Sequence, residues 1–209
     1  METNYDPLQL KGLLTAYTRK TTYNAGGVTL HSPLHMPFNK SNYLPLNSKK
    51  LDTLIKHFHQ LHFLLIDEAS LIGATLLYEV DKRLRQIKHT PTCYFGNVDL
   101  ILSEDLYQAQ PIKDSFIFEK PIVSNQIIPY SFWEHEIKCY ELRTRMRQKY
   151  IDCITILNKM RLNKQSNNGI QYINAHYYRP TPIDPLFHYL YYRNKDVHKH
   201  NDRMTKCFH

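Results

Sequence analysis

Two adjacent carboxylates, Asp67 and Glu68, end the apolar part of the segment "FLLIDEASLIG" at residues 63–73. An aliphatic run of this length, followed directly by acids, is typical of a buried strand with both faces covered. Acids at the carboxyl end of such a strand lie in the crevice where open α/β sheets bind ligands. One carboxylate can hold a divalent cation there, while its neighbour orients or deprotonates a water. The alternative is a surface turn in which Ser70 caps the next helix, and these residues alone leave both interpretations open.

Other chemical groups in the sequence do not form a second candidate site. The segment "HFHQLH" offers three histidines and "KCFH" offers Cys207 and His209. A structural zinc site needs four ligands at matched spacings, and neither cluster has a paired partner elsewhere. Nucleophilic catalysis has no support, because there is no G-x-S-x-G segment and no cysteine in a motif-like setting.

The elements that must position Asp67 and Glu68 follow from hydrophobic periodicity. Apolar stretches predict four strands, at residues 12–17, 63–68, 97–105 and 137–142. Helical patterns predict helices over residues 48–61, with Ser48 as N-cap, and over 76–87 and 150–161. Strands alternating with helices of this size imply βαβ units and an α/β fold with a mainly parallel sheet.

The helix predicted over residues 76–87 has one apolar stripe, with charged residues off it. The stripe consists of Leu77, Val80, Leu84 and Ile87, and the residues off it are Asp81, Lys82 and Arg85. The third predicted helix keeps Tyr150, Ile154 and Leu157 on one face. These stripes are the faces that we expect to pack on the sheet.

Composition limits the class of protein. The 209 residues, 42% hydrophobic and 22% charged, suit one globular core, or one domain plus part of another. The formal net charge of +8 favours an anionic partner such as nucleic acid. The four cysteines are scattered, which indicates a reducing compartment. No apolar run reaches ~18 residues and the polar start is no signal peptide, so we expect an intracellular protein without a membrane span.

The chain is expected to divide near Gly169. Residues 32–47 carry three prolines without a clear period, and they predict an excursion from the core. Beyond Gly169 the sequence becomes rich in Tyr, Pro, His and basic residues. We therefore predict a partial domain over residues 1–168, and a linker with the start of a second, truncated domain over 169–209.

Four blocks, in their order along the chain, carry a family resemblance. They are "LLTAYTRKTTYNAGGVTLHSPLHMPFNK", "LLIDEASLIGATLLYEVDKRLRQI", "FGNVDLILSEDLYQAQPI" and "ELRTRMRQ…LNKMR". Together they resemble the Pif1-like DNA helicases, particularly those linked to Helitron-type elements, over roughly residues 10–205. The resemblance implies a superfamily 1 motor, in which two RecA-like domains clamp ATP and move 5′-to-3′ along single-stranded DNA. It thus implies a RecA-like parallel sheet flanked by helices.

The resemblance assigns nucleotide chemistry to named residues. Asp67 and Glu68 match the Walker B pair, so Asp67 would hold Mg²⁺ and Glu68 would position or activate the hydrolytic water. Asp105 and Gln108 match motif III, in which the glutamine senses the γ-phosphate of ATP. Arg147 matches the arginine that neutralises charge on the transferred phosphoryl group. Without the resemblance, Gln108 is an ordinary loop amide and Arg147 an exposed arginine at a helix entry.

Two further segments match motifs Ia and Ib, which in the family touch single-stranded DNA. Hydroxyls and a lysine suit phosphate and sugar contacts, which are polar and indifferent to base sequence. The candidate contacts are Thr15, Thr18, Lys20, Thr29, His31 and Ser32. The implied partners are single-stranded DNA or duplex junctions. Read without the family, the same residues form a hydroxyl-rich turn.

The chain also departs from the family pattern. It has no Walker A loop G-x-x-x-x-G-K-[ST], and the residues before Gly12 are too few for the missing strand, loop and helix. Arg19 stands where the family has glycine in motif Ia, and Glu104 replaces the glycine of motif III. Without the Walker A amides and lysine, which grip the phosphates, Mg²⁺ and ATP should bind poorly. We expect the chain alone to be inactive.

The implied function is therefore that of a Pif1-like ATP-dependent DNA helicase fragment lacking the Walker A unit. The family acts in DNA repair, recombination and telomere maintenance, and the resemblance implies a nuclear or mitochondrial location. The alternative is a non-catalytic remnant of a transposon-derived helicase that still binds single-stranded DNA.

Overall fold

The computed structural model describes residues 11–18, 26–37, 46–144, 146, 150–175, 189 and 191–207. The chain divides into two compact units, Met1–Leu142 and Arg143–His209. This division falls ahead of the boundary predicted near residue 168. Among the described residues, no helix is long and apolar enough to cross a membrane.

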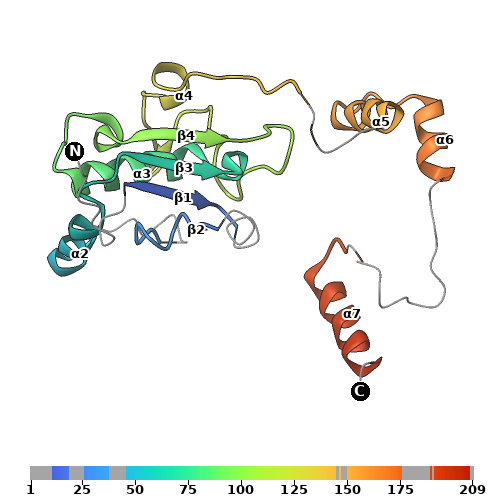
Figure 1. Cartoon of the computed structure of the whole chain (residues 1–209), viewed down its shortest axis with the longest axis horizontal. Coiled ribbons are helices and arrows are strands. Elements are labelled where there is room, and N and C mark those ends of the chain that lie inside the picture. Colours follow the sequence, from blue (N-terminus) through green and yellow to red (C-terminus); the bar gives the residue numbers. More distant parts are fainter. Residues whose placement is uncertain are drawn as a thin grey trace, which may run out of the picture. The chain divides into compact units, whose positions relative to one another are not determined.

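A four-stranded sheet with the order β2-β1-β3-β4 is the centre of the first unit (Figure 1). Its strands are β1 (Gly12–Ala16), β2 (Val28–Thr29), β3 (Phe63–Asp67) and β4 (Asp99–Ser103). Every neighbouring pair in this sheet is parallel. The α/β class and the first three predicted strands are thereby confirmed, apart from a few terminal residues.

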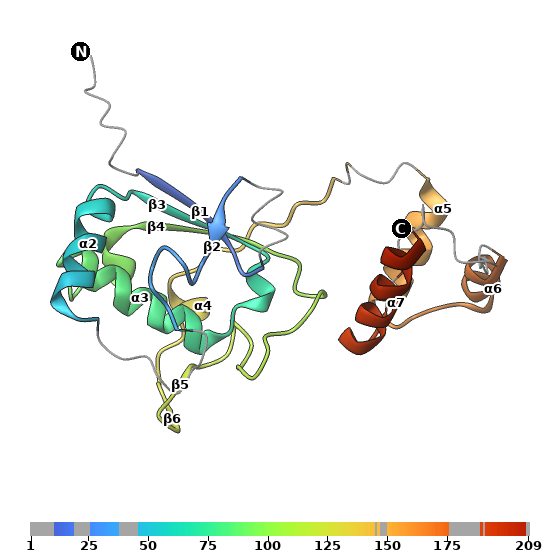
Figure 2. The same ribbon diagram turned by 90° about the horizontal axis from the view of Figure 1, so that it is seen from below.

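The helices of this unit lie on one side of the sheet (Figure 2). α2 (Ser48–Phe58) precedes β3, α3 (Ala74–Lys88) connects β3 to β4, and the short α4 (Phe132–His135) follows β4. The step from β2 over β1 to β3, which carries α2, and the step from β3 to β4, which carries α3, run in the same direction across the sheet. Right-handed crossovers in one direction bring their helices to one face, which explains the one-sided arrangement.

Shorter elements complete the first unit. They are the 3₁₀ turns η2 (Ala69–Leu71) and η3 (Tyr94–Asn97) and the hairpin strands β5 (Ile122–Val123) and β6 (Gln126–Ile127). β5 is joined to α3 by the Thr75 side chain, whose hydroxyl donates to the Ile122 carbonyl at 3.2 Å.

The core lies between the helices and one face of the sheet. Leu64 and Ile66 of β3 are completely buried there. The predicted stripe of α3 is confirmed, since all four of its residues are at most 1% exposed: Leu77, Val80, Leu84 and Ile87. Two residues of the predicted excursion over residues 32–47, Leu34 and Met36, are also buried in this core, so residues 32–37 of that segment pack with the domain.

No described helix of the first unit covers the other face of the sheet (Figure 2). Phe63 and Ile101 on this face are 44% and 48% exposed, and neither belongs to the buried core. In the register of the sheet, Leu65 pairs with Leu14 of β1 on one side and with Ile101 of β4 on the other. Leu14 and Leu65 are half-buried. The expectation that β3 is covered on both faces is therefore wrong for the described part of the chain, because both crossovers bring their helices to the same face.

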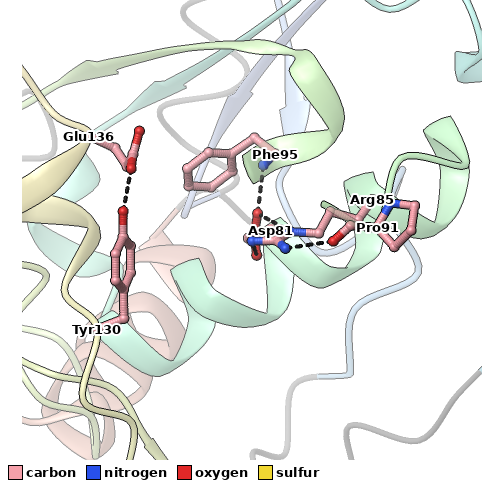
Figure 3. Close-up of polar contacts among 6 residues, drawn as sticks. All are labelled: Asp81, Arg85, Pro91, Phe95, Tyr130 and Glu136. Carbon is pink, nitrogen blue, oxygen red and sulfur yellow. Dashed lines mark hydrogen bonds and ion pairs between the residues drawn. The ribbon is translucent and has the colours of Figure 1, made fainter. Parts of the chain in front are cut away.

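Asp81 is off the apolar stripe of α3, as predicted, but it is buried, with 1% of its surface exposed. Its Oδ1 accepts from the backbone N–H of Phe95 at 2.5 Å and from Arg85 Nε at 2.9 Å, and its Oδ2 lies 2.8 Å from Arg85 Nη2 (Figure 3). Arg85 also donates to the carbonyl of Pro91 at 2.8 Å. Burial lowers the pKa of Arg85, but hydrogen bonding to Asp81 and the charges of Asp81 and nearby tyrosines outweigh it, and the pKa is raised. The pair thus fixes η3 to α3.

Two local predictions need correction. Residues 137–142 form no strand; Lys138 to Leu142 are exposed and pair with no strand of the described sheets. The N-cap of α2 is Asn47 rather than Ser48, because the Asn47 side chain accepts from the N–H of Lys50 at 2.9 Å. The side chain of an N-cap residue accepts from a backbone N–H two or three residues further on. Asn47 meets this condition with Lys50, so the N-cap lies one residue earlier than predicted.

In the second unit the described residues form the helices α5 (Ile151–Arg161), α6 (Asn167–Ala175) and α7 (Asn194–Cys207). The α5 helix was predicted to pack through Tyr150, Ile154 and Leu157. Tyr150 and Leu157 are 79% and 45% exposed, and no residue of α5 is fully buried. Thus α5 exists as predicted, but its apolar face is largely open in the described part of the chain.

Candidate functional site

Four of the predicted site residues end or follow strands at the carboxyl edge of the parallel sheet: Asp67, Glu68, Asp105 and Gln108. Asp67, the last residue of β3, is in register with Ala16 at the end of β1 and with Ser103 at the end of β4. The residues that follow these strands therefore leave the sheet at the same edge. This is the edge at which open α/β sheets bind ligands.

The chain turns sharply at the two acids. Asp67 Oδ1 accepts from the backbone N–H of Glu68 at 3.0 Å. Glu68 has a left-handed backbone, with φ 53° and ψ 45°, which is uncommon for a residue other than glycine and ends the strand. Such strained positions are frequent at functional sites. Both side chains are half-buried.

The alternative interpretation, a turn capped by Ser70, is not what the structure shows. Ser70 is buried, and the N-cap of α3 is Gly73, which has no capping side chain. Instead, the carboxylate of Asp114 caps α3, because it accepts from the N–H groups of Thr75 and Leu76, both at 3.4 Å. No local signal could have predicted this cap, because Asp114 is 39 positions from Thr75 in the sequence.

Asp105 organises the turn after β4. Its Oδ1 accepts from the N–H of Tyr107 at 3.1 Å, and its backbone carbonyl accepts from the N–H of Gln108 at 2.9 Å. Its Oδ2 accepts from Gln108 Nε2 at 3.3 Å. The exposed Gln108 amide is therefore held by Asp105, with its carbonyl oxygen left to act as an acceptor.

Glu104 adds an acid to the same strand end. Its Oε2 is buried and has no hydrogen-bond partner among the described residues. Burial, and then the neighbouring charge of Asp105, raises the pKa of the Glu104 carboxyl above its ordinary value of 4.5. The ionised form is thus disfavoured at the edge where a triphosphate would add further negative charge.

Replacing Glu104 with glutamine should stabilise the fold at neutral pH. Because the folded-state pKa is raised, the ionised carboxylate destabilises the native state, and the penalty appears as pH rises through that pKa. We expect Glu104→Gln to gain about 1 kcal/mol at pH 7, allowing for its partial exposure, and to match the wild type near pH 3. Urea denaturation at both pH values measures this, and an equal gain at both would show that ionisation is not the cause.

The candidate DNA contacts fall into two groups. Thr15 is 1% exposed, and its hydroxyl donates to the Leu65 carbonyl at 3.0 Å, so it joins β1 to β3 instead of facing a ligand. His31 is 6% exposed, and its burial lowers the pKa of the imidazole. The centroids of the His31 and Tyr17 rings lie 5.6 Å apart in an edge-to-face arrangement. Ser32 is exposed, and Thr18 and Thr29 are half-buried. The sixth candidate, Lys20, lies outside the described residues, as does Arg147, which was predicted to act on the phosphoryl group.

The donor set at this edge fits a metal held together with a nucleotide. In nucleotide sites Mg²⁺ uses one or two carboxylates and completes its shell with phosphate and water oxygens. Asp67, at the end of β3, could supply one such carboxylate. No group of three or more His, Cys, Asp or Glu in the described ranges could hold a metal by itself.

Parallel strands joined by helical crossovers define an α/β fold of RecA-like type, and the solved neighbours share this fold. The PIF1-like helicase family model matches residues 15–173. The chain therefore belongs to the PIF1-like helicase family.

Individual relatives agree with this assignment. The chain is 29% identical over 211 aligned positions to the ATP-dependent DNA helicase PIF1 of Saccharomyces cerevisiae (strain YJM789), covering 92% of this chain and 22% of that protein. A Pif1 from Bacteroides, solved bound to single-stranded DNA, superimposes with a TM-score of 0.70 at 22% identity, covering 92% of this chain and 46% of that one. For the Candida albicans Pif1 helicase the TM-score is 0.73 at 24% identity, covering 92% and 43%. The chain thus spans less than half the length of these relatives.

Proposed function

We propose that this chain provides part of the ATP-binding domain of a PIF1-like DNA helicase, an ATP-dependent motor that unwinds DNA 5′-to-3′. The observation that supports this is the register of β3 and β4, which brings Asp67, Glu68 and the Asp105–Gln108 turn to one edge of the sheet. The family match and the fold are consistent with it.

Each residue has a role that its geometry suits. Asp67 would hold Mg²⁺ on a bound nucleotide, and Glu68 would position or deprotonate the attacking water. Asp105 fixes the Gln108 amide, whose carbonyl oxygen is then free to orient that water or report the γ-phosphate. Arg147 would neutralise charge on the phosphoryl group, and the exposed or half-buried Thr18, Thr29 and Ser32 would contact the DNA backbone, together with Lys20.

We expect no ATP turnover above background from this chain alone, with Mg²⁺ and single-stranded DNA present. The sequence has no Walker A loop, and Glu104 places a further acid at the phosphate side of the sheet. A coupled-enzyme ATPase assay of the wild type and of Glu68→Gln tests this. DNA-stimulated hydrolysis that Glu68→Gln abolishes would overturn the expected inactivity and would establish the catalytic role of Glu68 directly.

The second candidate is a non-catalytic module that binds single-stranded DNA. The charge of +8 favours it, and salt-dependent binding without nucleotide turnover would distinguish it from the motor. In either case the proposed setting is intracellular, nuclear or mitochondrial, with roles in DNA repair, recombination and telomere maintenance.

A further inference from the structure

The positive charge of the chain is concentrated in its second unit. Residues 143–209 contain 13 Lys and Arg against 4 Asp and Glu, whereas residues 1–142 contain 14 against 15. The unit with the candidate nucleotide site is therefore close to neutral. Since non-specific nucleic-acid binding depends on cations that replace counterions, the attraction must come mainly from the second unit.

Within that unit, α7 carries a regular stripe of cations. Residues at positions i, i+4, i+8 and i+11 of an α-helix share one face, because each residue turns the helix by about 100°. In α7 these positions are occupied by four exposed basic residues: Lys195, Lys199, Arg203 and Lys206. The first three are spaced about 6 Å apart along the helix axis. Asp202 is the one acid within this stripe.

The opposite face of α7 is packed against aromatic residues of the preceding segment. His200, Val197 and Met204 are half-buried there. The rings of Tyr189 and Tyr191 lie 4.6 Å and 5.4 Å from the His200 ring, and the Tyr191 hydroxyl is 3.0 Å from His200 Nδ1. These contacts fix the rotation of α7 and leave the basic stripe exposed.

An unpacked aromatic ring lies at the start of the stripe. Tyr192 is 100% exposed, although its neighbour Tyr191 packs on the helix. A cationic track for the backbone, with an exposed ring for stacking a base, is the combination by which proteins hold single strands without reading their sequence.

We infer that the basic stripe of α7, with Tyr192, is the main single-stranded DNA contact of this chain. The inference deepens the proposed DNA-binding function, and it rests on single-stranded DNA being the partner of the chain. An anionic membrane fits less well, because an interfacial helix buries a wide face of bulky apolar residues, and α7 offers only Val197 and Met204.

The experiment compares two variants of the full chain with equal charge change. One replaces the four cations of the stripe with glutamine. The matched control replaces four exposed lysines of the first unit: Lys49, Lys50, Lys56 and Lys120. The binding of a fluorescent oligo-dT is measured by anisotropy over a salt series. We expect the stripe variant to lose affinity by about tenfold or more and its salt slope to fall by about 3, since each single-strand phosphate contact contributes ~0.7.

Two single substitutions separate the inference from misfolding. Asp202→Asn should tighten binding about two- to threefold, because it removes the only acid from the stripe, and an unfolded variant would not gain affinity. Tyr192→Ala should reduce the preference for single strands over duplex of equal length.

The outcomes are distinguishable. Equal losses in the stripe variant and in its control, or tighter binding to anionic vesicles than to oligo-dT, would overturn the assignment to α7. No binding of oligo-dT by the wild type would instead contradict the proposed DNA partner itself.

Discussion

Replacing Asp81 with alanine is expected to lower the free energy of unfolding by about 3 kcal/mol, the low end for breaking a buried ion pair. The change removes the acceptor of the Phe95 N–H and leaves the Arg85 guanidinium without its carboxylate. The low end applies because Arg85 is 22% exposed, so its charge can be partly solvated by water. Urea denaturation followed by circular dichroism measures the loss.

The neighbouring ion pair between Lys82 and Glu79 provides the control. The Lys82 side chain is 46% exposed, and its nitrogen lies 3.1 Å from Glu79. Only the Lys82 end of this pair is solvated, since the Glu79 side chain is 7% exposed, so Lys82→Ala should change stability by less than about 1 kcal/mol, well below the loss for Asp81→Ala. Similar losses in both variants would mean that Asp81 acts only as a helix-surface charge.

Gly96→Ala is expected to destabilise the fold by about 3 kcal/mol, by combining two backbone penalties. Gly96 has φ +65°, which costs an L side chain energy wherever it occurs. In addition, an added Cβ would lie 2.6 Å from the carbonyl oxygen of Leu84, a backbone atom within α3 that cannot move without disturbing the helix. Thermal and urea denaturation give the size of the effect.

Gly26 is a matched control, because it has nearly the same φ of +67° with nothing within 4 Å of an added Cβ. Gly26→Ala should therefore cost only the conformational part, about 1 kcal/mol. Equal costs at the two glycines would contradict a role for the close approach of η3 to α3.

Local periodicity predicted β1, β3, β4, α2, α3 and α5, but it also predicted a strand at residues 137–142 that does not form, and it gave no tertiary partners. The α3 stripe and the strand before Asp67 depend on spacing alone, and both were confirmed. The cap of α3 by Asp114 and the burial of Asp81 depend on segments that return to α3 from elsewhere in the chain. Spacing within a helix carries no information about such contacts.

At the candidate site, too, the sequence predicted the position of residues better than the direction of their side chains. The order of motifs predicted which residues would reach the carboxyl edge, and the register of β3 with β4 places them there. A motif does not say which way a strand residue points. Thr15 is two residues from Leu13, so both lie on the covered face of β1. The Thr15 hydroxyl donates to the Leu65 carbonyl within the sheet. The period of two in β1 already contained this information.

The uncovered face of the sheet gives the purified chain a second response to ionic strength. Sulfate and similar salts strengthen the association of apolar surfaces such as that around Phe63 and Ile101, whereas any salt weakens contacts between lysines and phosphates. Sulfate at concentrations that would release a bound polynucleotide, the proposed partner, thus also favours self-association of the protein. Low-salt buffers with a competing polyanion avoid both problems.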